Sequence, residues 1–167
     1  LHHTKDFAGA LITARIIGQD MIYCEAESWT SWVAVNGIYK KEDGLDYADS
    51  LLSASGDFSE WHIAERYYAL AHYSKYIPVG SVALDLGLRP TEQDNTFNAF
   101  AFHTPAGETV LVAVNEQEET APELCGDFQT MKVIVSDQSE KLKTVYDGAF
   151  TGRVTVPENA IVTVILG

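Results

Sequence analysis

Basic residues are scarce in this sequence: 11 lysines and arginines stand against 24 aspartates and glutamates, which gives a formal net charge of −13 at pH 7. Nucleic-acid binding depends on clustered Lys and Arg side chains that neutralise phosphates, and the sequence has no such cluster. It also has no apolar run of about 18 residues, the length that a membrane-spanning helix needs. We therefore expect neither a nucleic-acid partner nor a membrane span.

The N-terminal residues, LHHTKDFAGAL, lack the basic region and apolar core of a signal peptide. The chain does not begin with Met, so we expect it to start within a larger protein. Only two cysteines are present, Cys24 and Cys125, and they have no C-x-x-C spacing that would indicate a metal or redox motif. Two buried thiols are favoured, and a disulfide between them is left open.

The N-terminal part of the chain predicts two helices with a strand and a long loop between them. Apolar residues recur at three- and four-residue spacing over Asp6–Gln19 and predict a helix. Met21–Ala26 predicts a short strand, and the following Gly-, Asp- and Ser-rich segment predicts a long loop. Glu60–Tyr76 predicts a second helix, for which Ser59 is the expected N-cap.

The pattern changes near residue 79, where short β-branched runs separated by turn signals begin. Seven strands are predicted in this part, and this regular spacing is typical of a β-sandwich. The predicted strands are Ser81–Leu86, Thr96–His103, Thr109–Asn115, Met131–Ser136, Leu142–Tyr146, Thr151–Val156 and Ala160–Leu166. Because the lone N-terminal strand has no sheet partner for its backbone groups, we infer that residues 1–78 are the tail of a barrel whose earlier strands lie outside this chain.

Five motifs occur in a fixed order along the chain: SWTSWVAVN, DGLDYAD, RYYALAHYSKYIPVGSVAL, NAFAFHTPAGETVLVAVNE and VTVPENAIVTVIL. This series resembles the C-terminal portion of glycoside hydrolase family 30, which includes glucosylceramidases, xylanases and endo-β-1,6-galactanases. The resemblance implies a fold of two domains. Residues 1–78 would be the last helix–strand–helix of a (β/α)₈ catalytic barrel, and residues 79–167 an all-β sandwich. Met21–Trp29 would then be the eighth barrel strand.

The same resemblance implies a retaining β-glycoside hydrolase whose two catalytic glutamates lie on the fourth and seventh barrel strands. Both strands would precede residue 1, so we expect no catalytic residue in this chain and no activity of the chain alone. The implied partners are an oligo- or polysaccharide substrate and the N-terminal part of the same enzyme. No metal or organic cofactor is expected. Ser31 stands where glucosylceramidases carry an acid, so lipid-linked glucose is not indicated. The family favours a secreted or periplasmic location.

Trp32 is the first candidate for sugar binding, because it matches the tryptophan that lines the substrate pocket of the family on the eighth strand. Trp29 is the second candidate. An indole ring can stack on the apolar face of a pyranose, although both tryptophans could instead belong to the core. If the segment is extended, residues three apart face oppositely, so only one of the two is expected to line the pocket.

The acidic residues can be explained by structural or solvent-exposed roles as well as by functional ones. Glu25 and Glu27 would share one face of a strand, but the family places neither catalytic role there. The loop KKEDGLDYAD could shape the aglycone side of a cleft or form a solvated surface. His72 is expected to be a hydrogen-bonded structural histidine.

As an alternative function, the chain could be a non-catalytic carbohydrate-binding or structural β-sandwich module.

Overall fold

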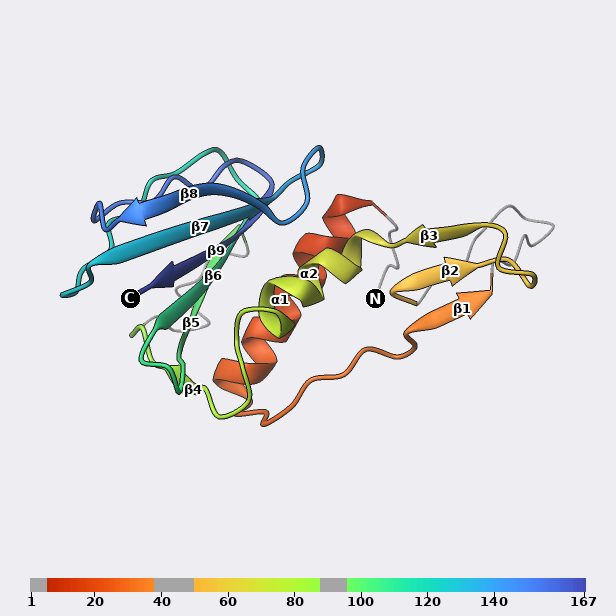
Figure 1. The fold of residues 1–167 in the computed structure, drawn as a ribbon, viewed down its shortest axis with the longest axis horizontal. Coiled ribbons are helices and arrows are strands. Elements are labelled where there is room, and N and C mark those ends of the chain that lie inside the picture. The colour runs from red at the N-terminus through yellow and green to blue at the C-terminus, as the bar shows by residue number, and fades with distance from the viewer. Residues whose placement is uncertain (1–5, 38–49, 88–95) are drawn as a thin grey trace.

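The computed structural model describes residues 6–37, 50–87 and 96–167, and it contains two helices and two sheets (Figure 1). The elements of the N-terminal part are α1 (Phe7–Tyr23), β1 (Val35–Gly37), β2 (Leu52–Ala54), β3 (Trp61–Ile63) and α2 (Glu65–Ser74). Those of the C-terminal part are β4 (Val82–Leu84), β5 (Phe97–His103), β6 (Thr109–Asn115), β7 (Thr130–Ser136), β8 (Lys143–Ala149) and β9 (Ala160–Leu166).

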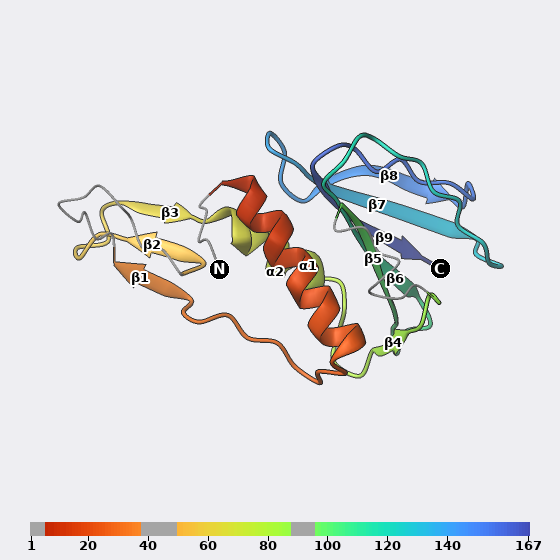
Figure 2. The same cartoon turned by 180° about the vertical axis from the view of Figure 1, so that it is seen from behind.

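The C-terminal part forms one six-stranded antiparallel sheet with the order β4-β5-β6-β9-β7-β8. The helices α1 and α2 pack side by side on one face of this sheet (Figures 1 and 2). The opposite face is covered by residues 116–129 and 150–159, which contribute Leu124, Phe128, Phe150, Val154 and Val156 to a second apolar cluster. This layered arrangement is consistent with a β-sandwich domain.

Burial on both faces explains why the central strands have continuous apolar runs. On β6, Val112 and Val114 face the helices, whereas Leu111 and Ala113 face the second cluster. A strand that is covered on both sides has no solvent face for polar residues. The predicted bounds of β6 and β9 are confirmed by the structure. The predicted strand Thr151–Val156 is wrong, because this segment forms only isolated bridges to residues 120 and 123.

Helix α1 lies directly on the sheet where Gly18 meets Phe100. A Cβ atom at Gly18 would lie 2.2 Å from the Phe100 ring, so only glycine allows the helix this close. Tyr73 of α2 packs its ring edge against Phe102 and donates a hydrogen bond to the carbonyl of Ala14 at 2.7 Å. These contacts join both helices and the sheet into one core.

Two predictions for the N-terminal part are wrong. The expected strand Met21–Ala26 is not formed, because α1 continues to Tyr23 and a turn follows, in which the N–H of Cys24 bonds to the carbonyl of Gln19. Met21, Ile22 and Tyr23 pack against the core as helical residues, and this packing overrides the strand-like pattern. The second helix begins at Glu65 rather than Glu60, with Ala64 and not Ser59 at its N-cap.

The residues before α2 instead form a second, three-stranded sheet. β1 pairs in parallel with β2, and β2 pairs antiparallel with β3. The hairpin that joins β2 to β3 is closed by Asp57, whose carboxylate accepts hydrogen bonds from the hydroxyls of Ser55 and Ser59 at 2.7 and 2.8 Å. These hydrogen bonds lower the pKa of Asp57 to about 2. The small sheet lies beyond the helices, away from the large sheet (Figure 1).

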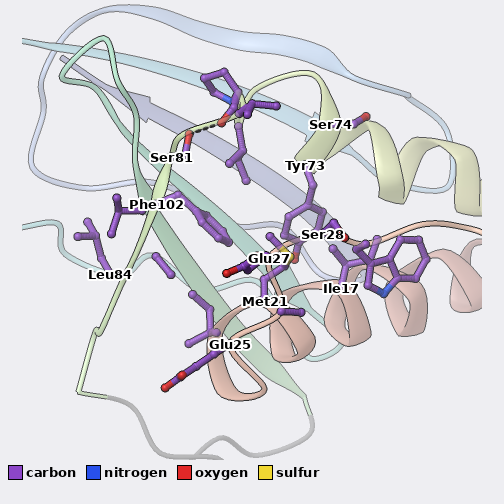
Figure 3. A pocket seen from close by; sticks show the side chains of 18 of the residues that line it. Ile17, Met21, Glu25, Glu27, Ser28, Tyr73, Ser74, Ser81, Leu84 and Phe102 are labelled. Carbon is purple, nitrogen blue, oxygen red and sulfur yellow. Dashed lines mark hydrogen bonds between the residues drawn. The ribbon is translucent and has the colours of Figure 1, made fainter.

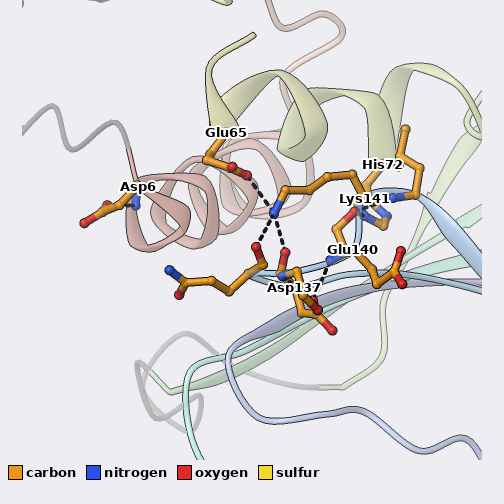
Figure 4. A network of polar contacts seen from close by, with 11 residues as sticks. Asp6, Glu65, His72, Asp137, Glu140 and Lys141 are labelled. Carbon is orange, nitrogen blue, oxygen red and sulfur yellow. Dashed lines mark hydrogen bonds and ion pairs between the residues drawn. The ribbon is translucent and has the colours of Figure 1, made fainter. Parts of the chain in front are cut away.

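Lys141, in the turn between β7 and β8, connects the large sheet to the N-terminal ends of both helices (Figure 4). Its Nζ lies 3.0 Å from Oε2 of Glu65 at the start of α2, and it donates to the carbonyls of Asp137 and Gln138. The same ammonium lies 4.6 Å from the ring centroid of Phe7, the first residue of α1. The side chains of Lys141 and Glu65 are mostly shielded from water.

We expect Lys141→Met to lower the free energy of unfolding by about 1–2 kcal/mol, because it leaves a shielded carboxylate without its cation. Methionine retains much of the apolar contact with Phe7. The matched control is Lys143→Met, which removes the more exposed ion pair with Glu140 and should change stability by less than about 0.5 kcal/mol. Urea unfolding of the three proteins measures the difference, and equal effects of the two substitutions would contradict the assignment.

Candidate functional site

The candidate sugar-binding segment is extended and makes few backbone hydrogen bonds. Residues 27–34 form neither helix nor strand, and they run as a drawn-out chain from the end of α1 to β1 (Figure 1). Their backbone N–H groups make no hydrogen bond to the described part of the chain, and only the carbonyls of Val33 and Ala34 accept bonds, from Leu51 and Leu52. Trp32 projects from this segment with 83% of its surface exposed, and the peptide bond that follows it is cis.

The other candidate, Trp29, is in a different environment. Its ring is half-buried against the core, and its Nε1 donates to the carboxylate of Asp20 on α1 at 3.1 Å. In this structure Trp29 therefore has a packing role, whereas Trp32 has an open face. The sugar contacts of both residues stay predictions.

A hollow of about 1260 Å³ lies between the C-terminal ends of α1 and α2 and the edge strand β4 (Figure 3). Its walls are mostly apolar and include Met21, Ile22, Leu70, Ile77 and Phe102. Trp29 contributes to the lining, but Trp32 does not. The two candidate tryptophans are therefore not brought together around one cavity.

The described polar residues around the hollow include two exposed glutamates and a buried tyrosine. Glu25 and Glu27 are exposed, line the hollow and lie in the turn after α1. The prediction that they share one face of a strand is wrong, because no strand forms there. Burial raises the pKa of Tyr73 well above its usual value, so its hydroxyl stays protonated and donates to Ala14. Binding by apolar contact is the chemistry that this lining supports best.

His72 is a fully buried structural residue, as predicted. Its Nδ1 lies 2.7 Å from the hydroxyl of Thr163 on β9, and its Nε2 lies 2.8 Å from the hydroxyl of Ser136 on β7. Ser136 accepts from the N–H of Leu142, and Thr163 donates to the carbonyl of His72. A neutral ring with the proton on Nδ1 satisfies every one of these groups, because Ser136 then donates to Nε2. The network fastens α2 to two strands of the sheet.

Acid is expected to weaken the fold through this histidine. Burial lowers the pKa of His72 to about 3, from an ordinary value of 6.5. Between these values the unfolded chain binds a proton that the folded chain does not, so stability falls as pH decreases from about 6.5 towards 3. The contribution of this one group is at most about 1.4 kcal/mol per pH unit. Urea unfolding at several pH values, compared with His72→Gln, measures it. An unchanged slope in the variant would contradict the assignment.

The prediction of two buried thiols is wrong. Cys24 and Cys125 are free thiols at exposed positions. In the ranges that the structure describes, no group of three or more His, Cys, Asp and Glu side chains is arranged to hold a metal ion. No helix in these ranges is long and apolar enough to cross a bilayer. The acidic loop KKEDGLDYAD lies outside the described residues. The sequence analysis did not identify Trp61 as an exposed strand residue, because the predicted helix Glu60–Tyr76 included it. The preceding Ser-Gly-Asp run is a turn signal that could have indicated the hairpin.

The fold belongs to a class seen in glycoside hydrolases of family 30, and the resemblance drawn from the sequence is confirmed at the level of the fold. The chain is similar to the catalytic domain of GH30 xylanase C from Talaromyces cellulolyticus, with 18% identity, a TM-score of 0.75 and coverage of 95% of this chain and 35% of that one. It is also similar to a GH30 endoxylanase from Clostridium papyrosolvens, with 18% identity, a TM-score of 0.70 and coverage of 98% and 40%.

A third similar structure is a conserved exported protein from Bacteroides fragilis, with 18% identity, a TM-score of 0.73 and coverage of 99% of this chain and 35% of that one. No protein-family model and no curated protein matches the sequence. The chain thus spans 35–40% of the length of these three structures.

Proposed function

We propose that this chain is the C-terminal portion of a retaining β-glycoside hydrolase that acts on β-linked glycans. The remaining strands and helices of the barrel, here called the barrel portion, would carry the two catalytic glutamates. This chain would supply one wall of the sugar site through Trp32. Residues 79–167 would support the barrel as a β-sandwich domain.

The observation that carries the proposal is the extended segment 27–34, whose backbone N–H groups have no hydrogen-bond partner in the described part of the chain. An extended chain in a folded protein normally satisfies its backbone N–H groups by pairing with neighbouring strands. Apart from the carbonyls of Val33 and Ala34, the backbone groups of these residues lack such pairing in the described part of the chain. Helix α1 precedes the segment and α2 follows it. Helix, extended segment and helix in this order are the repeating unit of a β/α barrel. We therefore propose that the eighth barrel strand is residues 28–37 rather than Met21–Trp29.

The exposure of Trp32 supports a role in binding. Active sites of β/α barrels lie at the C-terminal ends of the strands, and Trp32 lies near the middle of the proposed strand, three residues before β1. Its ring is exposed in this chain, and the proposed barrel portion would cover the segment. A flat, exposed indole matches the apolar face of a pyranose ring.

We expect Trp32→Ala to lower kcat/KM on β-xylan by about fivefold to thirtyfold when this chain is combined with its barrel portion, because a stacking surface worth about 1–2 kcal/mol is removed. Phe58→Ala is the control, since Phe58 is another highly exposed aromatic residue, in the hairpin turn, with 73% of its surface exposed. Reducing-sugar release measures both variants.

The proposed function itself is tested with two unsubstituted samples, the chain alone and the chain combined with its barrel portion. The chain combined with its barrel portion should release reducing sugar from a β-glycan, and the chain alone should release none. If the chain alone instead binds xylo-oligosaccharides and the combined protein has no hydrolytic activity, the non-catalytic binding module replaces the proposal.

A further inference from the structure

The small sheet has one face that is entirely apolar. Pairing places Val35, Leu52 and Ile63 in one row across the three strands, and Gly37, Ala54 and Trp61 in the next row on the same side. The opposite side presents Asn36, Ser53 and His62. We call the first side the apolar face of the small sheet.

Much of this apolar face is open in the chain as it stands. Trp61 is 61% exposed, Val35 is 54% exposed and Ile63 is 36% exposed. A three-stranded sheet usually needs its hydrophobic face packed against another layer to be stable. An exposed face of this composition is typical of a protein–protein contact.

The composition of the face argues for a protein surface as its occupant. A sugar site combines an aromatic ring with several polar groups that bond to hydroxyls, whereas this face carries aliphatic side chains and one indole. A second copy of this chain is disfavoured, because each copy carries a formal net charge of −13. A protein that already contacts the adjoining residues 28–34 needs no sugar-binding polar groups on this face, and it does not bring two copies of the same acidic chain together.

We propose that the apolar face of the small sheet is a docking surface for the barrel portion of the same enzyme. This inference rests on the proposed function, in which residues 28–34 pair with barrel strands. That segment runs without interruption into β1, so the proposed strand pairing and the apolar face form one continuous surface. The hairpin of β2 and β3 would extend this surface beyond the end of the barrel strand.

Three consecutive residues of β3 provide the test. Trp61, His62 and Ile63 alternate between the two faces, so single cysteines at these positions report on the two sides of one strand. The native thiols are first removed by Cys24→Ser and Cys125→Ser, both at exposed positions. Trp61→Cys, His62→Cys and Ile63→Cys are then reacted with a maleimide, in the chain alone and in the chain combined with its barrel portion.

We expect all three cysteines to react in the chain alone. In the combined protein, Trp61→Cys and Ile63→Cys should react at least about tenfold more slowly while His62→Cys is unchanged. Equal reactivity at the three positions in the combined protein would overturn the proposal, and so would a slow reaction in the chain alone that depends on its concentration, which indicates a second copy. Protection only by added xylo-oligosaccharide would also overturn it in favour of a sugar site. Hydrolysis of β-xylan by the same combined samples separates these outcomes from failure of the proposed function.

Discussion

His72→Ala is expected to lower the free energy of unfolding by about 3–4 kcal/mol. The substitution removes a fully buried ring and leaves the hydroxyl of Ser136 without its acceptor. An unsatisfied buried donor costs about 1–3 kcal/mol, and the cavity left by the ring adds to that cost. Thr163 keeps its bond to the carbonyl of residue 72, so the loss falls mainly on the side that faces β7. Chemical unfolding monitored by tryptophan fluorescence measures the change.

His62→Ala is the matched control for this prediction. His62 is an exposed histidine on β3, so its replacement should change stability by less than about 0.5 kcal/mol. A double variant, His72→Leu with Ser136→Ala, fills the space and removes the stranded donor, although it leaves the N–H of Leu142 without its acceptor. It should therefore recover part of the loss. If His72→Ala is as stable as the original chain, the network does not fasten α2 to the sheet.

Gly18→Ala is expected to destabilise the fold by about 2 kcal/mol even though alanine favours helices by about 1 kcal/mol over glycine. The added methyl group would lie 2.2–2.4 Å from three atoms of the Phe100 ring. Phe100 is itself almost completely buried, with the Tyr23 ring packed edge-on against it, so it has little room to move. The clash therefore outweighs the gain in helix propensity.

Two companion variants test whether the contact with Phe100 causes the effect of Gly18→Ala. Gly56→Ala adds a methyl group where nothing lies within 4 Å, and it should be neutral within about 0.5 kcal/mol. Gly18→Ala combined with Phe100→Leu should be more stable than the sum of the two single effects, because the smaller side chain makes room. Stabilisation by Gly18→Ala alone would show that α1 does not approach β5 this closely.

The C-terminal half was more predictable from sequence than the N-terminal half. The runs at β6 and β9 are bounded by turn residues and buried on both faces, so their bounds follow from local pattern. Met21, Ile22 and Tyr23 fit a helix or a strand equally well, and only their packing on the large sheet decides between the two. Ile63 also fits the periodicity of the following helix, and the predicted start at Glu60 included Trp61, so the hairpin was hidden within the α2 prediction.

The surroundings of the candidate tryptophans could not be predicted from the sequence. Trp32 was named as a candidate because its position matches a family motif, and its role in sugar binding stays a prediction. The hydrogen bond that ties Trp29 to Asp20 depends on the extra turn of α1, which the sequence pattern did not indicate. The contacts of Lys141 with Glu65 and Phe7 join segments that are far apart in the chain, and no local pattern announces such contacts.

Amide hydrogen exchange of residues 28–34 tests most directly the claim that this segment is a barrel strand without its neighbours. In the chain alone these amides should exchange rapidly, because they have no partner in the described structure, whereas those of β6 and β9 should be protected. When the barrel portion is added, residues 28–34 should become protected together. Strong protection in the chain alone, or rapid exchange that the barrel portion does not change, would contradict the account.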